Sequence, residues 1–114
     1  MTRLKPEDGR FAPFFDYFEK NKSTTGDCEK ILEARTDSPT FEAYLSDTTT
    51  PTATVYFYGT VSGTKWDLLA SISLSGAGDV GTFTPQMNVS YTRYKAYVQA
   101  ISGTSAAVTT AMGY

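Results

Sequence analysis

The sequence of 114 residues contains no histidine and only one cysteine, Cys28. Without histidine the chain lacks the usual general base, the usual zinc ligand and the side chain that titrates near neutral pH. A single cysteine cannot form an intramolecular disulfide, and neither a Cys-His pair nor a Ser-His-Asp triad can be assembled. We therefore expect a protein that is not an enzyme and binds no cofactor or metal, with Cys28 as a small buried residue.

Basic charge and long apolar segments are also missing. The formal net charge is −2, so we expect no nucleic-acid partner. No apolar run approaches the roughly 20 residues of a membrane-spanning helix, so we expect no membrane partner. The N-terminus lacks the apolar segment of a secretory signal, which predicts synthesis in a cytoplasm. The length fits one domain.

The second half of the chain is almost uncharged and rich in Ser, Thr, Gly, Ala, Val and Tyr. Apolar residues alternate with polar ones in stretches at about 40–46, 53–58, 66–74, 93–100 and 106–112. This spacing is typical of half-buried strands. In the stretch at 66–74, the alternation places on one face Trp66, Leu68, Ala70, Ile72 and Leu74. Glycine-containing turns separate the stretches and favour antiparallel hairpins. The sequence thus predicts an all-β fold, an antiparallel β-sandwich or jelly-roll-like domain, with a further short strand near Ile31 and Leu32.

The first part of the chain differs in character, because it is charged and rich in phenylalanine. Residues 1–27 are predicted to form an extended N-terminal arm, and residues 28–114 the β-sandwich domain. Pro13 suits the first position of a helix, so a short helical turn is expected over residues 13–20. Free tails are poor in aromatic residues, so this arm is a candidate protein interface. Its interface residues would be Phe11, Phe14, Phe15 and Phe18, and either docking on another subunit or folding back on the sandwich would bury them.

Tyrosine is the most unusual component, with eight residues in the chain. Tyr56 and Tyr58 share one face of their strand, opposite Val55 and Phe57. If Val55 and Phe57 point into the core, the two tyrosines form an outward aromatic patch and a second candidate protein interface. Aromatic rings on a strand face can also stack on sugars, which leaves a glycan-binding module open.

The acidic residues of the second half offer little chemistry. Asp67 is expected on the polar face of a strand and Asp79 in a glycine-rich turn, rather than as a catalytic carboxylate pair. A calcium site near Asp79 or Asp47 is a minor alternative.

The stretch from Ala53 to Tyr114 carries a loose motif. It begins with a strand at 54–59, Thr-Val-Tyr-Phe-Tyr-Gly, which is followed by a glycine turn and by Trp-Asp-Leu-Leu at 66–69. A Ser/Gly-rich turn comes next. The motif then continues with Tyr-Lys-Ala-Tyr-Val-Gln-Ala-Ile-Ser-Gly-Thr at 94–104 and ends with a strand at 108–113. This half of the chain resembles small virion structural proteins of tailed bacteriophages, of the capsid decoration or cement type. The N-terminal arm is not part of the pattern.

The resemblance implies a role and a place. Such a protein binds the outer surface of the lattice of the major capsid protein and stabilises the shell, often as a homo-oligomer, a dimer or trimer. Its location would be the capsid exterior of the virion, after synthesis in the host cytoplasm. The pattern is also similar to parts of neck and fibre proteins. A neck or tail connector, a fibre subunit and a glycan-binding β-sandwich module therefore stay as alternatives.

Overall fold

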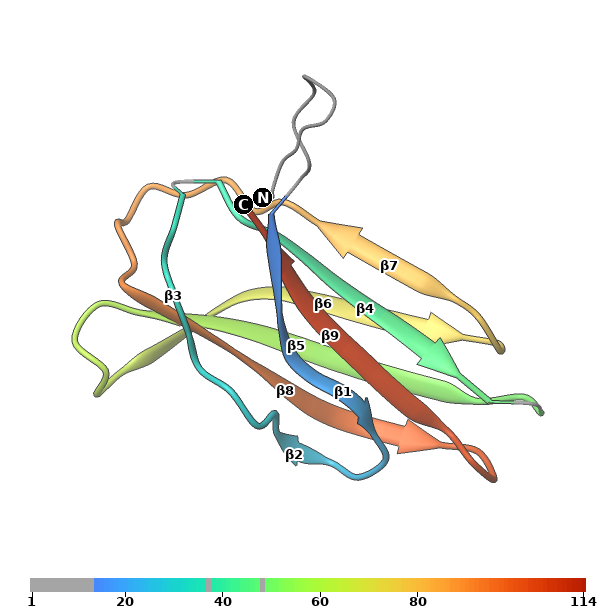
Figure 1. Ribbon diagram of the computed structural model, residues 1–114. Coiled ribbons are helices and arrows are strands. Elements are labelled where there is room, and N and C mark those ends of the chain that lie inside the picture. The colour runs from blue at the N-terminus through green and yellow to red at the C-terminus, as the bar shows by residue number, and fades with distance from the viewer. Residues whose placement is uncertain (1–13, 37, 48) are drawn as a thin grey trace, which may run out of the picture.

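The computed structural model describes residues 14–36, 38–47 and 49–114, and in these residues it is all β, with no helix. No helix that could cross a membrane is therefore found in this part of the chain. Phe11 lies outside the described residues. The strands, labelled in Figure 1, are β1 (Phe15–Lys22), β2 (Gly26–Asp27), β3 (Leu32–Glu33), β4 (Thr40–Ser46), β5 (Thr52–Thr60), β6 (Trp66–Ser75), β7 (Val80–Phe83), β8 (Arg93–Ser102) and β9 (Ala107–Gly113).

The strands form two antiparallel sheets packed on each other, as a β-sandwich (Figure 1). One sheet has the order β1-β9-β4-β7, and the other has the order β2-β8-β5-β6, with β3 also paired to β8. The pairing is nested along the chain, since β1 pairs with β9, β2 and β3 with β8, β4 with β7, and β5 with β6. The second half of the chain thus supplies partners for the first half.

The core lies between the sheets and is built from the inward residues of the alternating strands. On β4 and β5, every second residue is buried, beginning with Phe41 and Ala53. Three phenylalanine rings meet at the centre: the Phe41 ring stacks on that of Phe57 at 4.8 Å, and the Phe18 ring lies 5.8 Å from Phe57. This aromatic cluster joins β1 and β4 of one sheet to β5 of the other.

The predicted helical turn over residues 13–20 is not present in the described residues, because Phe15–Lys22 is strand β1. An isolated helix of two turns is marginal, whereas a strand satisfies its backbone by pairing with β9 from Phe15 opposite Gly113 onward. Pairing also brings Phe18 into the core, where it is fully buried. Residues 14–27 therefore lie in the sandwich itself, so the boundary drawn after residue 27 does not separate an arm from the described domain. Strand β7 was not expected either.

A bulge changes the faces of β6. Ala70 pairs with Phe57 and Leu68 pairs with Tyr58, so Leu69 is an extra residue on β6. An extra residue reverses the side to which the preceding residues point. Ala70 is buried, whereas Leu68 and Trp66 lie on the outer face. The expected grouping of Trp66 with Ala70 on one face is therefore wrong.

Candidate functional site

The outer face of the five-stranded sheet carries a cluster of aromatic side chains. Val55 and Phe57 are fully buried, so Tyr56 and Tyr58 point outward, as the alternation predicted. In the register of β5 and β8, Tyr56 is opposite Tyr97. Directly opposite residues in an antiparallel pair have adjacent side chains on the same face. We name as the aromatic face the side chains of Tyr56, Tyr58, Trp66, Lys95 and Tyr97.

Lys95 lies at the middle of the aromatic face. Its ammonium nitrogen is 4.8 Å from the centre of the Trp66 ring and 5.5 Å from that of the Tyr58 ring. The same nitrogen forms an ion pair of 3.4 Å with the Asp27 carboxylate on β2. A cation near an aromatic ring is attracted by the negative ring face. These contacts therefore hold together side chains from four strands: β5, β6, β8 and β2. The result is an aromatic surface that contains one ion pair, between Lys95 and Asp27.

The electrostatics of the aromatic face favour the uncharged form of Tyr58. Burial raises the pKa of Tyr58 above its ordinary value of 10.0, and Tyr56, Tyr97 and Asp27 raise it further. The Tyr58 hydroxyl is therefore a neutral donor and acceptor rather than a nucleophile near neutral pH. The arrangement is suited to binding by stacking and hydrogen bonding.

The phenylalanines of the N-terminal part do not stay together. Phe14 and Phe15 are about half exposed, whereas Phe18 is buried in the core and cannot serve as an interface residue in this fold. The Phe14 ring stacks on Tyr114 at 6.2 Å, and the Phe15 ring meets Tyr17 edge to face at 5.2 Å. Of the two ways of burying the arm residues that were expected, Phe18 is buried by the sandwich of its own chain.

Beside Phe15 and Tyr17 the outer face of the four-stranded sheet is slightly hollowed. The hollow has a volume of about 290 Å³, and small residues of β9, Ala111 and Gly113, line it together with Thr82 of β7. This surface is on the opposite side of the sandwich from the aromatic face, because it belongs to the other sheet. Of the sequence-predicted interface residues, Phe14 and Phe15 thus lie at this surface, whereas Tyr56 and Tyr58 lie on the opposite one.

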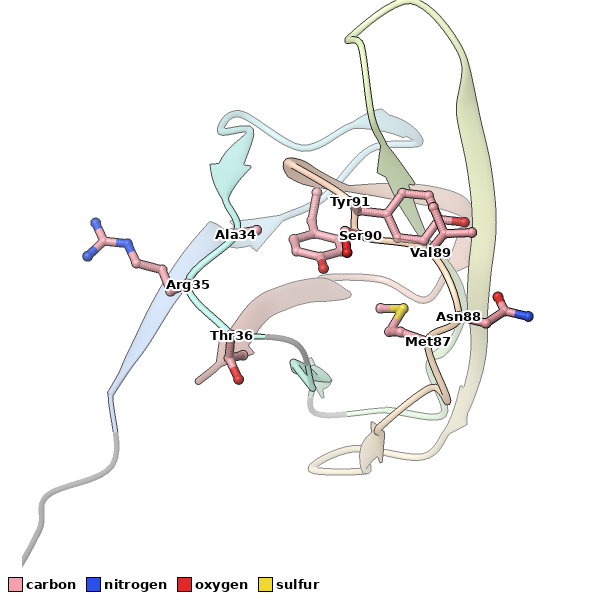
Figure 2. Close-up of a pocket in the computed structure, with 9 residues that line it drawn as sticks. Ala34, Arg35, Thr36, Met87, Asn88, Val89, Ser90 and Tyr91 are labelled. Carbon is pink, nitrogen blue, oxygen red and sulfur yellow. The ribbon is translucent and has the colours of Figure 1, made fainter.

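A larger hollow of about 680 Å³ lies at one end of the sandwich (Figure 2). It is lined by residues 34–36 on one side and by residues 87–91 and Tyr94 on the other. Arg35 is the charged residue of this lining, and Figure 2 shows its side chain pointing away from Met87 and Tyr91. The Arg35 guanidinium carbon lies 5.5 Å from the Tyr114 ring centre instead. The lining therefore brings no acid and base together.

The remaining candidate groups have structural partners. The Tyr91 hydroxyl donates to Asp67 at 3.0 Å, and the Ser75 amide donates to Asp79 at 2.9 Å. Asp47 accepts from the Thr49 hydroxyl at 3.0 Å. Within residues 14–36, 38–47 and 49–114, no three acidic or cysteine side chains are grouped to hold a metal ion.

Cys28 is buried, and its sulfur lies 3.4 Å from the Thr110 hydroxyl oxygen. Burial raises the pKa of the Cys28 thiol above its ordinary value of 9.0. A raised pKa keeps the thiol protonated and poorly nucleophilic near neutral pH. The expectation of a small buried residue is confirmed.

Three members of the aromatic face were not singled out as site residues from the sequence. Lys95 and Tyr97 could have been found, since they alternate with the buried Tyr94, Ala96 and Val98 on β8. Trp66 could not, because only the bulge at Leu69 brings it to the outer face.

Comparisons with protein-family models, with curated proteins and with solved structures found no significant match. The aromatic face is therefore interpreted from its own residues.

Proposed function

We propose that this chain is a structural protein of a tailed-bacteriophage virion, a decoration or cement protein that binds the outer surface of the major capsid lattice. The resemblance of residues 53–114 to such proteins supports this role. The observation that carries the proposal is the aromatic face, an outer surface of ordered tyrosine and tryptophan side chains whose lysine, Lys95, is paired with Asp27. Tyr and Trp are enriched in the cores of protein interfaces, and charged residues are depleted there.

The order of the strands supports the same role by analogy of fold. Strands β2 and β3 both pair with β8 and can be counted as one interrupted strand, which gives eight strands. The first of these eight pairs with the last, the second with the seventh, the third with the sixth and the fourth with the fifth. We infer that this sandwich is a jelly roll, an architecture common in viral capsid and lectin domains. The analogy is one of fold alone, and the aromatic face gives it chemical content.

In the proposed mechanism the aromatic face docks on the capsid surface. Tyr56, Tyr58 and Trp66 would bury apolar ring area, and their polar atoms would find partners at the rim. The contacts of Lys95 with the Trp66 and Tyr58 rings hold these rings before binding. Prior ordering reduces the entropy that docking costs.

The effect on the shell would be thermodynamic. A ligand that binds only the assembled shell stabilises it in proportion to the logarithm of its free concentration. Many copies over a symmetric lattice would add their contributions, and linked copies would bind more tightly than single ones. No reaction is required of the protein.

The test uses shells assembled from the major capsid protein encoded in the same genome. Trp66 is the sole tryptophan of the chain, so its fluorescence reports directly on the aromatic face. We expect the chain to cosediment with the shells in many copies. Tyr58→Ala should weaken this binding at least about tenfold, since an interface hot spot is worth more than about 1.4 kcal/mol.

The matched control is Tyr44→Ala, because Tyr44 is exposed on the outer face of the other sheet. It should leave shell binding unchanged. Equal loss in both variants, or no cosedimentation of the unmodified chain, would contradict the proposal. Labelling this chain in intact virions separates the alternatives. The label would appear at one vertex for a neck or tail connector, on the fibres for a fibre subunit, and over the whole shell for a decoration protein.

Glycan binding is a second candidate that the aromatic face also favours. Tyr56, Tyr58 and Trp66 could stack on sugar rings, with Lys95 and Asp27 beside them as hydrogen-bonding groups. Titration of the isolated protein with oligosaccharides, followed by Trp66 fluorescence, tests this candidate. A saturable change that Tyr58→Ala removes would support it, and an unchanged spectrum across the set of oligosaccharides would count against it.

A further inference from the structure

Strand β6 is a long strand at the edge of its sheet. It spans ten residues, Trp66–Ser75, and among the described strands it pairs only with β5. Edge strands in natural proteins are commonly protected by charged residues, proline or bulges. The bulge of β6 is at Leu69, and the six residues after it, Ala70 to Ser75, contain neither a charge nor a proline. This half of β6 is therefore a regular, neutral edge.

Strand β7, an edge strand of the other sheet, lies on the same side of the sandwich as β6. A Cβ atom on Gly81 of β7 would lie 2.5 Å from Cγ2 of Ile72 on β6, so the two edges are close there (Figure 1). Phe83 pairs with Phe41, so both side chains point to the same face of their sheet. Phe41 is fully buried, whereas Phe83 is 48% exposed. The sandwich is thus open along this side, and an inward-facing aromatic ring is left half covered.

The open edge is complementary to itself. In an antiparallel pairing of β6 with a second β6 about a twofold axis, residues of the same face oppose each other. With the axis at Ser73, the serines at 71, 73 and 75 would face serines, and Ile72 would face Leu74. With the axis at Ile72, Ser71 would face Ser73, and Ala70 would face Leu74. With either axis, no like charges are opposed among residues 70–75. Hydroxyl pairs of this kind already occur in the sheet, where Thr52 Oγ1 lies 2.6 Å from Ser102 Oγ across β5 and β8.

We propose that the chain forms a homodimer by antiparallel pairing of β6 with β6 of a second copy. The five-stranded sheets of the two copies become continuous. The backbone groups of residues 70–74 that point away from β5 gain hydrogen bonds, and the second copy covers the open side that exposes Phe83.

The pairing has a consequence for the aromatic face. The twofold axis of an antiparallel strand pair is perpendicular to the sheet, so both aromatic faces lie on the same side of the dimer. A surface that binds one face can then bind both, and the second contact is intramolecular. The dimer is inferred from the β6 edge and does not depend on which surface the aromatic face binds.

The test adds charge at two exposed serines of β6, Ser71 and Ser73. In S71K/S73K, lysines of the two copies oppose each other whether the twofold axis passes Ile72 or Ser73, and in S71E/S73E glutamates do. The control Q99K/T104K adds the same charge at exposed positions on and after β8. Sedimentation equilibrium gives the mass, and circular dichroism confirms that each variant is folded.

We expect the unmodified chain and the control to have the mass of two chains, and each β6 variant alone to have the mass of one. An equal mixture of the lysine and glutamate variants should regain the mass of two chains, because opposite charges then face each other. An unmodified chain of single mass, dimeric β6 variants, or a mixture that stays single would each overturn the proposal. No capsid is present in this experiment, so its failure is separate from failure of the proposed shell binding.

Discussion

The ring of Phe18, from a strand that the sequence pattern did not predict, lies 5.8 Å from the ring of Phe57 at the centre of the opposite sheet. Both side chains are fully buried. The contact ties the N-terminal strand β1 into the sandwich core, so the packing of β1 is part of the stability of the whole domain.

Phe18→Ala is therefore expected to destabilise the protein by about 3–5 kcal/mol, the usual cost of a cavity left by a buried phenylalanine. Phe15→Ala is the matched control, since Phe15 is 52% exposed on the same strand. It should change the unfolding free energy by no more than about 0.5 kcal/mol, as surface substitutions usually do. Urea unfolding measures both. Equal effects of the two substitutions would mean that β1 is not held through Phe18.

Trp66→Ala should leave the domain folded, because Trp66 lies on the outer face and is only partly buried. Its cost in unfolding free energy should fall well below the about 3–5 kcal/mol of a core aromatic residue. Loss of the ring also removes its contact with Lys95. Circular dichroism during denaturant titration gives the measurement, since the variant has no tryptophan fluorescence. An unfolded variant would place the indole in the core after all.

Stability should fall at alkaline pH. Burial raises the pKa of Cys28 above 9.0 and those of Tyr58 and Tyr91 above 10.0. Each folded-state group keeps a proton that the unfolded chain releases, so stability is full below pH 9.0 and declines as the pH rises above it. Cys28→Ala should flatten the first part of this decline. Unfolding midpoints measured across this pH range check the prediction, and a rise in stability above pH 9.0 would contradict it.

Gly81→Ala tests how closely the sheets approach at the β7 edge. The added Cβ would lie 2.5 Å from Cγ2 of Ile72, a buried side chain with little room to move. We expect a loss of about 1–3 kcal/mol, typical of overpacking. At Gly113, the control, the added Cβ would lie 3.8 Å from the Phe14 carbonyl oxygen, which is an ordinary contact. Thermal unfolding should distinguish the two, and equal melting temperatures would refute the close approach.

The local alternation of apolar and polar residues was sufficient to predict most of the long strands of the sandwich. Period-2 alternation predicted β4 over Thr40–Ser46, and it located β5, β6, β8 and β9 to within a few residues. The outward direction of Tyr56 and Tyr58 follows from the same alternation, because Val55 and Phe57 are apolar enough to fix which face is buried. Their service as an interface remains a prediction.

The errors arose where distant segments decide the structure. Residues 15–20 have an aromatic spacing that a short helix could use, and only the free edge of β9, close to the other end of the chain, makes them a strand. Strand β7 is four residues long and exposed in most of its length, so its sequence carries little periodicity. Phe18 was expected at an interface because burial by its own sandwich could not be distinguished from burial by a partner.

The sequence by itself determined that the chain is an antiparallel all-β protein with Cys28 as its single thiol and without histidine chemistry, because composition and alternation are local properties. The tertiary structure decided which strands are neighbours, where β6 bulges, and therefore which aromatic rings meet at Lys95. One extra residue in a strand reverses the faces of those before it, and that choice depends on the partner strand, which is distant in sequence.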